Sequence, residues 1–210
     1  CALKRFVPQK LREDSMMYFA VVTMALGIRM LDQTSSFSAV VIAFLLGGTV
    51  GHFMHLDDSI AALPKRFAGK AGGSFDVSVF ITGLTLFCIS TSGLVGAIVL
   101  GFSGDSTLLI TKAVMDIIAA VFFAAAGAGM MQALIAIPLG IVLFGLYFAS
   151  GLIMPLLTDS MIGDFSSCGG LILMLNGFRM TKLKNPPVAD FIPSLILMLP
   201  ISWLWSTYVG

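Results

Sequence analysis

The chain has 210 residues, of which 58% are hydrophobic and only 11% are charged, and its mean hydropathy is +1.00. A soluble domain carries about a quarter charged residues, so this composition excludes an ordinary water-soluble protein and predicts that most side chains face lipid. The net charge of +1 provides no strong field that would attract nucleic acid, and we expect no such partner.

Apolar runs follow one another along the whole chain. A helix needs about 20 residues to cross roughly 30 Å of hydrocarbon. On this basis the sequence predicts seven spans, at 15–31, 36–55, 77–101, 106–128, 131–157, 160–178 and 190–208. Backbone groups in lipid must bond within their own segment, so continuous runs favour helices over strands. We therefore expect an all-α, polytopic transmembrane helix bundle in which residues 1–210 form a single transmembrane domain.

Basic residues gather on one side of this predicted bundle. They lie in the N-terminal segment and in the 57–75 and 179–189 connections: Lys4, Arg5, Lys10, Arg12, Lys65, Arg66, Lys70, Arg179, Lys182 and Lys184. The opposite side has only Arg29. Cytoplasmic loops are rich in lysine and arginine, so we expect these three stretches in the cytoplasm. The 57–75 connection is the only extramembrane loop of appreciable length.

The sequence offers little for a metal or cofactor. Three cysteines are scattered without the spacing of a disulfide framework or a zinc site: Cys1, Cys88 and Cys168. No phosphate loop, nucleotide fingerprint or HExxH motif occurs, and we expect neither a cofactor nor an enzymatic activity. His52 and His55 share one helix face close to Asp57 and Asp58, but without further ligands the pattern favours a solvated interface over a metal site.

Two ionisable residues in the fourth predicted span are the clearest candidates for function. Asp116 lies about 15 Å along the helix from the start of its span, near the membrane midplane, and Lys112 precedes it by one turn on the same face. Ionisable groups at this depth are costly and mark substrate or ion paths. The alternative is a purely structural ion pair. Lysine before aspartate is the less favourable order within one helix, which favours partners on other helices.

Small polar residues lie at mid-depth in two further spans. The third span contains Ser90, Thr91, Ser92 and Gly93, and the sixth contains Ser166, Ser167, Gly169 and Gly170. Glycine-interrupted spans are typical of discontinuous helices at a transporter site, because unwound backbone offers N–H and C=O groups to a ligand. We expect these residues to line a site together with Lys112 and Asp116. Close helix packing, which small residues permit, is the alternative.

Several motifs together resemble one known family. They are Phe87-Cys88, Gly96-Ala97, Gly104-Asp105, Lys112, Asp116, Met161, Asp164-Phe165-Ser166, Gly169-Gly170-Leu171 and Gly177. The combination resembles the YqgA-like bacterial inner-membrane proteins, long catalogued as a domain of unknown function. The resemblance covers nearly the whole chain and implies a multi-pass protein of the bacterial inner membrane. It also implies a further glycine-rich helix before Cys1, which we expect because the chain begins without methionine. It implies no settled activity.

These features predict a small transporter or channel for a small polar solute or ion. Asp116 would bind a cation, a proton or an amine, and Lys112 would bind an anionic group. The alternative is a non-transporting assembly or signalling component of the membrane, which would use its glycines for helix contacts and the 57–75 loop for a partner. The lipid bilayer is the expected surrounding, and the small size of the chain suggests a homodimer.

Overall fold

The computed structural model of the chain describes residues 9–59, 84, 87, 91–124, 129–181, 184 and 186–209. Throughout these ranges the regular structure is helical and contains no strand, as the all-α prediction requires. Three helical segments are long and apolar enough to cross a membrane, namely Met131–Leu156, Asp159–Met180 and Val188–Tyr208. Shorter apolar helices occupy Met17–Leu31, Phe37–Phe53 and Ser92–Ser103. Most of the predicted 57–75 loop and the first part of the predicted 77–101 span lie outside the described residues.

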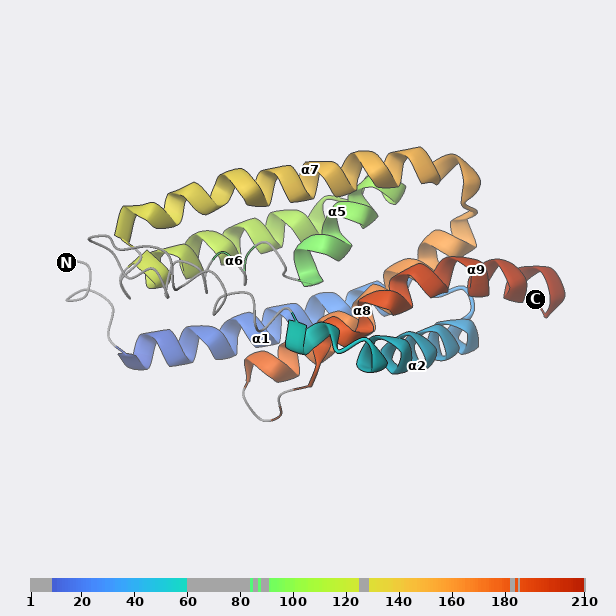
Figure 1. The fold of residues 1–210 in the computed structure, drawn as a ribbon, viewed down its shortest axis with the longest axis horizontal. Coiled ribbons are helices and arrows are strands. Elements are labelled where there is room, and N and C mark those ends of the chain that lie inside the picture. Colours follow the sequence, from blue (N-terminus) through green and yellow to red (C-terminus); the bar gives the residue numbers. More distant parts are fainter. Residues whose placement is uncertain are drawn as a thin grey trace.

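Four helices from the two ends of the chain pack into one group, which we call the four-helix group. It consists of α1 (Gln9–Leu31), α2 (Phe37–Phe53), α8 (Asp159–Met180) and α9 (Ile192–Tyr208). The chain enters α9 through a short 3-10 segment, η5 (Val188–Phe191). Helix α8 lies antiparallel along α1, and α9 lies antiparallel along α2, so segments far apart in the sequence are neighbours (Figure 1). The α8 helix is the most enclosed, because every residue from 163 to 170 is buried.

Glycine allows the helices of the four-helix group to approach closely. A side-chain carbon at Gly170 of α8 would lie 2.6 Å from the carbonyl oxygen of Gly27 on α1, and one at Gly27 would meet the Gly170 carbonyl at the same distance. On α2, Gly47 lies directly against Ser194 of α9. Small residues are the usual means by which membrane helices pack at short range. These positions therefore determine the α1–α8 and α2–α9 spacing.

Three further helices of the described residues form a second layer beside the four-helix group (Figure 1). They are α5 (Thr91–Ser103), α6 (Thr107–Phe123) and α7 (Ala136–Ile153), with short 3-10 segments η3 (Gly129–Ile135) before α7 and η4 (Met154–Leu156) after it. Helix α5 joins the layers, since it contacts α8 as well as α6 and α7. The ring of Phe102 on α5 packs edge to face on Phe165 of α8, with centroids 5.2 Å apart.

Helix α7 presents an apolar outer face. Ile141, Phe144 and Leu152 are 70%, 66% and 82% exposed, and none of them has a polar group that would need water. In water so much exposed apolar surface would be a liability, whereas in a bilayer it is the expected boundary with acyl chains. The exposure pattern therefore agrees with the lipid-facing composition of the sequence.

The sequence left a break and close packing open for the sixth span, and no break occurs there. Helix α8 continues without interruption from Asp159 to Met180, through the Ser166–Gly170 motif. Glycine within a helix costs about 1 kcal/mol relative to alanine. Here the close contact with α1 compensates for that cost, which is the packing alternative raised from the sequence. The other predicted break lies at the edge of the described residues, where α5 is regular from Thr91 onward and Ser90 falls outside.

Candidate functional site

Lys112 and Asp116 form an ion pair within α6. The Lys112 ammonium donates a hydrogen bond to Oδ2 of Asp116, with 2.5 Å between the nitrogen and the oxygen. The lysine side chain is 5% exposed and the aspartate side chain 23%. The expectation that each would find its partner on another helix is therefore wrong. In a region of low dielectric an unpaired charge is far more costly than an imperfect pairing order, so the residue one turn away becomes the partner.

Residues of the third predicted span surround the stem of Lys112. A side-chain carbon at Gly93 of α5 would lie 2.6 Å from Cε of Lys112, so the absence of a side chain at Gly93 makes room for the lysine. The Lys112 ammonium lies 5.9 Å from the centroid of the Phe87 ring, within the range of a cation–π interaction. Ser92 is half-buried on α5. Ser90 and the side chain of Thr91 lie outside the described residues.

A cavity of about 440 Å³ adjoins the ion pair. Its walls come from α6 on one side and from η3 and the start of α7 on the other, with Phe87 also in the lining. Ten of its thirteen lining residues are alanine, leucine, isoleucine or phenylalanine, and the polar ones are Lys112, Asp116 and Gln132. Small-molecule sites are typically apolar cavities of roughly 300–1,000 Å³ with a few placed polar groups. The cavity has this character.

Gln132 is the functional candidate that sequence reasoning missed. Its side chain belongs to η3, is 5% exposed, and has no hydrogen-bond partner for either Oε1 or Nε2 within the described structure. An unsatisfied buried donor or acceptor costs about 1–3 kcal/mol. Such an amide facing a cavity marks a position where a bound solute or water supplies the missing bonds. The signal was present, because Gln132 is a single amide within the apolar 131–157 run.

The α8 residues predicted to share this site do not line the cavity. Ser167 donates to main-chain carbonyls of α8 and α1 and accepts a hydrogen bond from Thr34. Gly169 packs on α5 and Gly170 on α1. Ser166 is fully buried, and its hydroxyl has no hydrogen-bond partner within the described structure. The motif therefore serves helix packing, whereas Gly93, from the other predicted set of small residues, packs against the stem of Lys112.

Asp164 is a second buried carboxylate, and it is fully engaged. Its Oδ1 accepts hydrogen bonds from the backbone N–H groups of Ser35 and Ser36, at 2.9 and 2.8 Å. Its Oδ2 accepts the hydroxyl of Ser202 on α9 at 2.6 Å. The side chain, which is wholly buried on α8, thus supplies the N-terminal cap that α2 lacks from its own residues. Asp164 fastens three helices together and leaves no room for a ligand.

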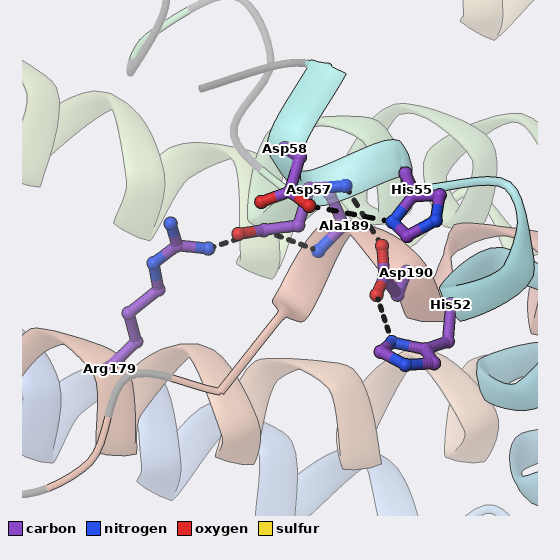
Figure 2. A network of polar contacts seen from close by, with 7 residues as sticks. All are labelled: His52, His55, Asp57, Asp58, Arg179, Ala189 and Asp190. Atoms are coloured by element: carbon purple, nitrogen blue, oxygen red, sulfur yellow. Dashed lines mark hydrogen bonds and ion pairs between the residues drawn. The ribbon is translucent and has the colours of Figure 1, made fainter. Parts of the chain in front are cut away.

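A polar network ties the other end of α2 to the start of α9 (Figure 2). Asp57 accepts hydrogen bonds from Arg179 at 2.5 Å and from the backbone N–H of Ala189 at 3.2 Å. In return Asp190 accepts the backbone N–H of Asp57 at 2.8 Å. The two carboxylates therefore cap each other's segments reciprocally. The network connects the end of α2 with α8 and η5, and its carboxylates bind donors that belong to the network itself.

The two histidines lie at the edge of this network (Figure 2). Nδ1 of His52 lies 3.3 Å from Oδ2 of Asp190, and Nδ1 of His55 lies 3.5 Å from Oδ2 of Asp58. Both imidazoles are largely exposed, at 73% and 71% of the side chain, as the sequence predicted for a solvated face. In the parts of the chain that the structure describes, no group of three or more histidine, cysteine, aspartate or glutamate side chains is placed to hold a metal ion.

Comparison with known proteins decides the family. A family model described as "Protein of unknown function (DUF554)" matches residues 1–203. The chain belongs to this family. It is similar to "Uncharacterized protein YqgA" of Escherichia coli (strain K12), with 33% identity over 214 residues that cover 98% of this chain and 90% of that protein. The resemblance to YqgA-like proteins is thereby confirmed.

A second relative carries a membrane description. The chain is 23% identical over 203 residues to "Uncharacterized membrane protein YdfK" of Bacillus subtilis (strain 168), covering 92% of this chain and 84% of that protein. The membrane description of this relative agrees with the long apolar helices of the chain. No solved structure matches the chain.

Proposed function

We propose that this DUF554 protein is a transporter or channel for a small polar solute or ion, and that the cavity between α6 and η3–α7 is its binding site. One observation supports the proposal above all. The cavity brings together the ion pair of buried Lys112 and half-buried Asp116 and a buried amide that has no partner among the described residues, in a lining that is otherwise apolar. A purely structural ion pair needs no adjacent space, and a packing residue in Gln132's place would be apolar.

The ion pair gives the site a resting state and a bound state. Without solute, Lys112 and Asp116 neutralise each other at a depth where either charge alone would be costly. A polar solute that enters the cavity takes the place of one residue as the partner of the other. Lys112 and Asp116 then separate and bind the solute in place of each other. Lysine suits this exchange because its charge sits on a long, flexible stem, which packs against Gly93.

We further propose seven membrane crossings, with basic connections in the bacterial cytoplasm. The helix ends support this arrangement. Asp57, which follows α2, meets Arg179 at the end of α8, so these basic connections share one side. At the opposite end of the bundle, Arg29 lies 4.0 Å from Asp105, and Asp164 accepts a hydrogen bond from the backbone N–H of Ser35. Helix α1 begins at one end of the long axis and α9 ends at the other, as an odd number of crossings requires (Figure 1).

A non-transporting membrane component is the second candidate. The continuous α8 helix, the saturated Asp164 carboxylate and the close glycine contacts favour it, because all three describe a tightly sealed group of helices. This description fits the four-helix group and not the α6–α7 side, where the cavity lies. We therefore assign binding to the second layer and support to the first, and propose no catalytic role.

Flux through reconstituted protein tests the proposed function. The purified chain is placed in liposomes, and uptake of protons, sodium, potassium, amino acids and organic acids is measured against protein-free liposomes. Asp116→Asn and Lys112→Met should each lower the flux of the transported solute at least about tenfold, the change expected on loss of one charge-assisted hydrogen bond.

Matched controls exist on the exposed surface. Asp58→Asn and Lys184→Met make the same chemical changes at exposed positions away from the cavity, and they should retain the parent flux. Size-exclusion profiles check that all four variants fold. The proposal fails if no solute in the screen moves faster than in protein-free liposomes, or if the cavity variants transport at the parent rate.

A further inference from the structure

The charges of the cavity restrict what can occupy it. Lys112 and Asp116 are together neutral, and no other residue in the lining is ionisable. A solute with a single charge can replace only one member of the pair and leaves the other without a partner. Breaking a buried ion pair in this way is strongly destabilising, because one charge remains desolvated and uncompensated. A solute that carries both charges gives each member a new partner and keeps the site neutral.

Gln132 adds a second complementary pair of groups. A glutamine amide offers one acceptor oxygen and two N–H donors. Its oxygen can accept from an ammonium group while its nitrogen donates to a carboxylate, and both amide atoms lack a partner within the described structure. Gln132 lies on η3 in the wall that also contains α7, and the ion pair lies on α6 in the opposing wall. A dipolar head group between the walls is therefore matched from both sides.

The remainder of the cavity suits an apolar body. Apart from the three polar residues, its walls are alanine, leucine, isoleucine and Phe87. Its volume of about 440 Å³ is far larger than a bare ion needs. Hydrophobic surface of the solute would be removed from water on entry, so an apolar side chain adds affinity in a way that a small hydrophilic solute cannot.

We propose that the cavity binds an apolar α-amino acid, with its carboxylate on Lys112 and the Gln132 amide nitrogen, and its ammonium on Asp116 and the Gln132 amide oxygen. This inference rests on the proposed function and names its substrate class. The apolar side chain of the amino acid occupies the space between α6 and α7. Binding separates Lys112 from Asp116, so the ion pair is the element that differs between the empty and the loaded site.

Binding to the purified chain tests the charge pattern. Three probes share nearly the same branched carbon skeleton: leucine, 4-methylpentanoate without the ammonium group, and 3-methylbutylamine without the carboxylate. Isothermal titration in detergent should show leucine binding at least about tenfold tighter than either analogue, since each analogue lacks one charge-assisted contact and leaves one buried charge unpaired. Gln132→Leu should weaken leucine binding by roughly tenfold.

The charge variants provide a sharper readout, because a structural role would not change selectivity. Lys112→Met removes the carboxylate partner and should reverse the preference in favour of 3-methylbutylamine. Asp116→Asn removes the ammonium partner and should reverse it in favour of 4-methylpentanoate. Asp58→Asn and Lys184→Met should keep the parent order of affinities.

Two results would overturn the inference. One is a parent protein that binds either single-charge analogue as tightly as leucine. The other is folded parent protein that shows no leucine binding at millimolar concentration. In both cases the proposed function survives if the liposome screen finds another solute whose flux depends on Asp116 and Lys112, and it fails separately if that screen finds none.

Discussion

Replacing Asp164 with alanine should destabilise the four-helix group, because this one carboxylate is shared by three helices. It lies on α8 with no exposed surface and accepts hydrogen bonds from two N–H groups at the start of α2 and from Ser202 on α9. Alanine removes both acceptor oxygens, and with them three hydrogen bonds, and leaves the donors in place. The cost is therefore set by what each donor can find instead.

The magnitude follows from the exposure of each donor. Ser202 is 1% exposed, so its hydroxyl has no access to water and costs about 1–3 kcal/mol when unpaired. Ser35 is exposed and Ser36 half-buried, so their N–H groups regain partial hydration and lose about 0.5–1.5 kcal/mol each. The sum is about 2–6 kcal/mol for Asp164→Ala. Asp164→Asn keeps the shape and an acceptor oxygen, so it should cost distinctly less.

Unfolding in mixed micelles measures the effect. Titration with sodium dodecyl sulfate, followed by the fluorescence of Trp203 and Trp205 on α9, gives the free energy of unfolding of each variant. Asp159→Ala serves as the control, since this exposed residue of the first turn of α8 has only the helix dipole to lose, about 0.3–1 kcal/mol. If Asp164→Ala unfolds within about 0.5 kcal/mol of the parent, the carboxylate does not fasten the helices.

Three further predictions concern other contacts. Gly170→Val should cost at least about 1–3 kcal/mol in the same titration because a side chain there meets the α1 backbone, whereas Gly145→Val on α7, with open space around it, should be neutral or slightly stabilising. Asp57→Ala should destabilise more than Arg179→Met, since only the former also deprives a backbone N–H of its acceptor; equal losses would show that the ion pair alone matters. Hydrogen bonds from Thr107 hold the pKa of Asp105 below its ordinary value. The ionised Asp105 therefore stabilises the fold at pH values above the ordinary pKa, and this contribution is lost as the pH falls through the lowered pKa of the folded state. Thermal unfolding between pH 6 and 2.5 should therefore show a smaller acid destabilisation for Asp105→Asn than for the parent, and identical profiles would contradict it.

Local spacing explains what the sequence could predict of the site. The proximity of Lys112 and Asp116 follows from one helical turn, and the length of each apolar run follows from the thickness of a bilayer. The contact between Gly93 and the stem of Lys112 does not follow, because it depends on how α5 packs on α6. The sequence also misjudged the partners of Lys112 and Asp116, because it gave weight to their unfavourable order within one helix. That order matters for an isolated helix in water and is a weak guide where desolvation dominates.

The Ser166–Gly170 motif shows why the remainder could not be predicted. A run of serine and glycine is compatible with an unwound helix and with a closely packed one. The atoms that decide between them belong to Gly27, on a helix from the other end of the chain. Gln132 illustrates the opposite case, in which the residue was visible as a lone amide in an apolar run and only its missing partners revealed its importance.

The pairing of the first helices with the last ones has a consequence for biosynthesis. Asp164, which caps α2, follows Ser35 by 129 residues. At about 5–20 residues per second, α1 and α2 wait roughly 6–26 s for that carboxylate to be translated. During this interval the glycine faces of both helices contact lipid, and the start of α2 has no side-chain cap. A nascent chain interrupted before α8 would carry two helices without their partners, so only a completed chain can close the four-helix group, and membrane quality control has a structural means to distinguish the two.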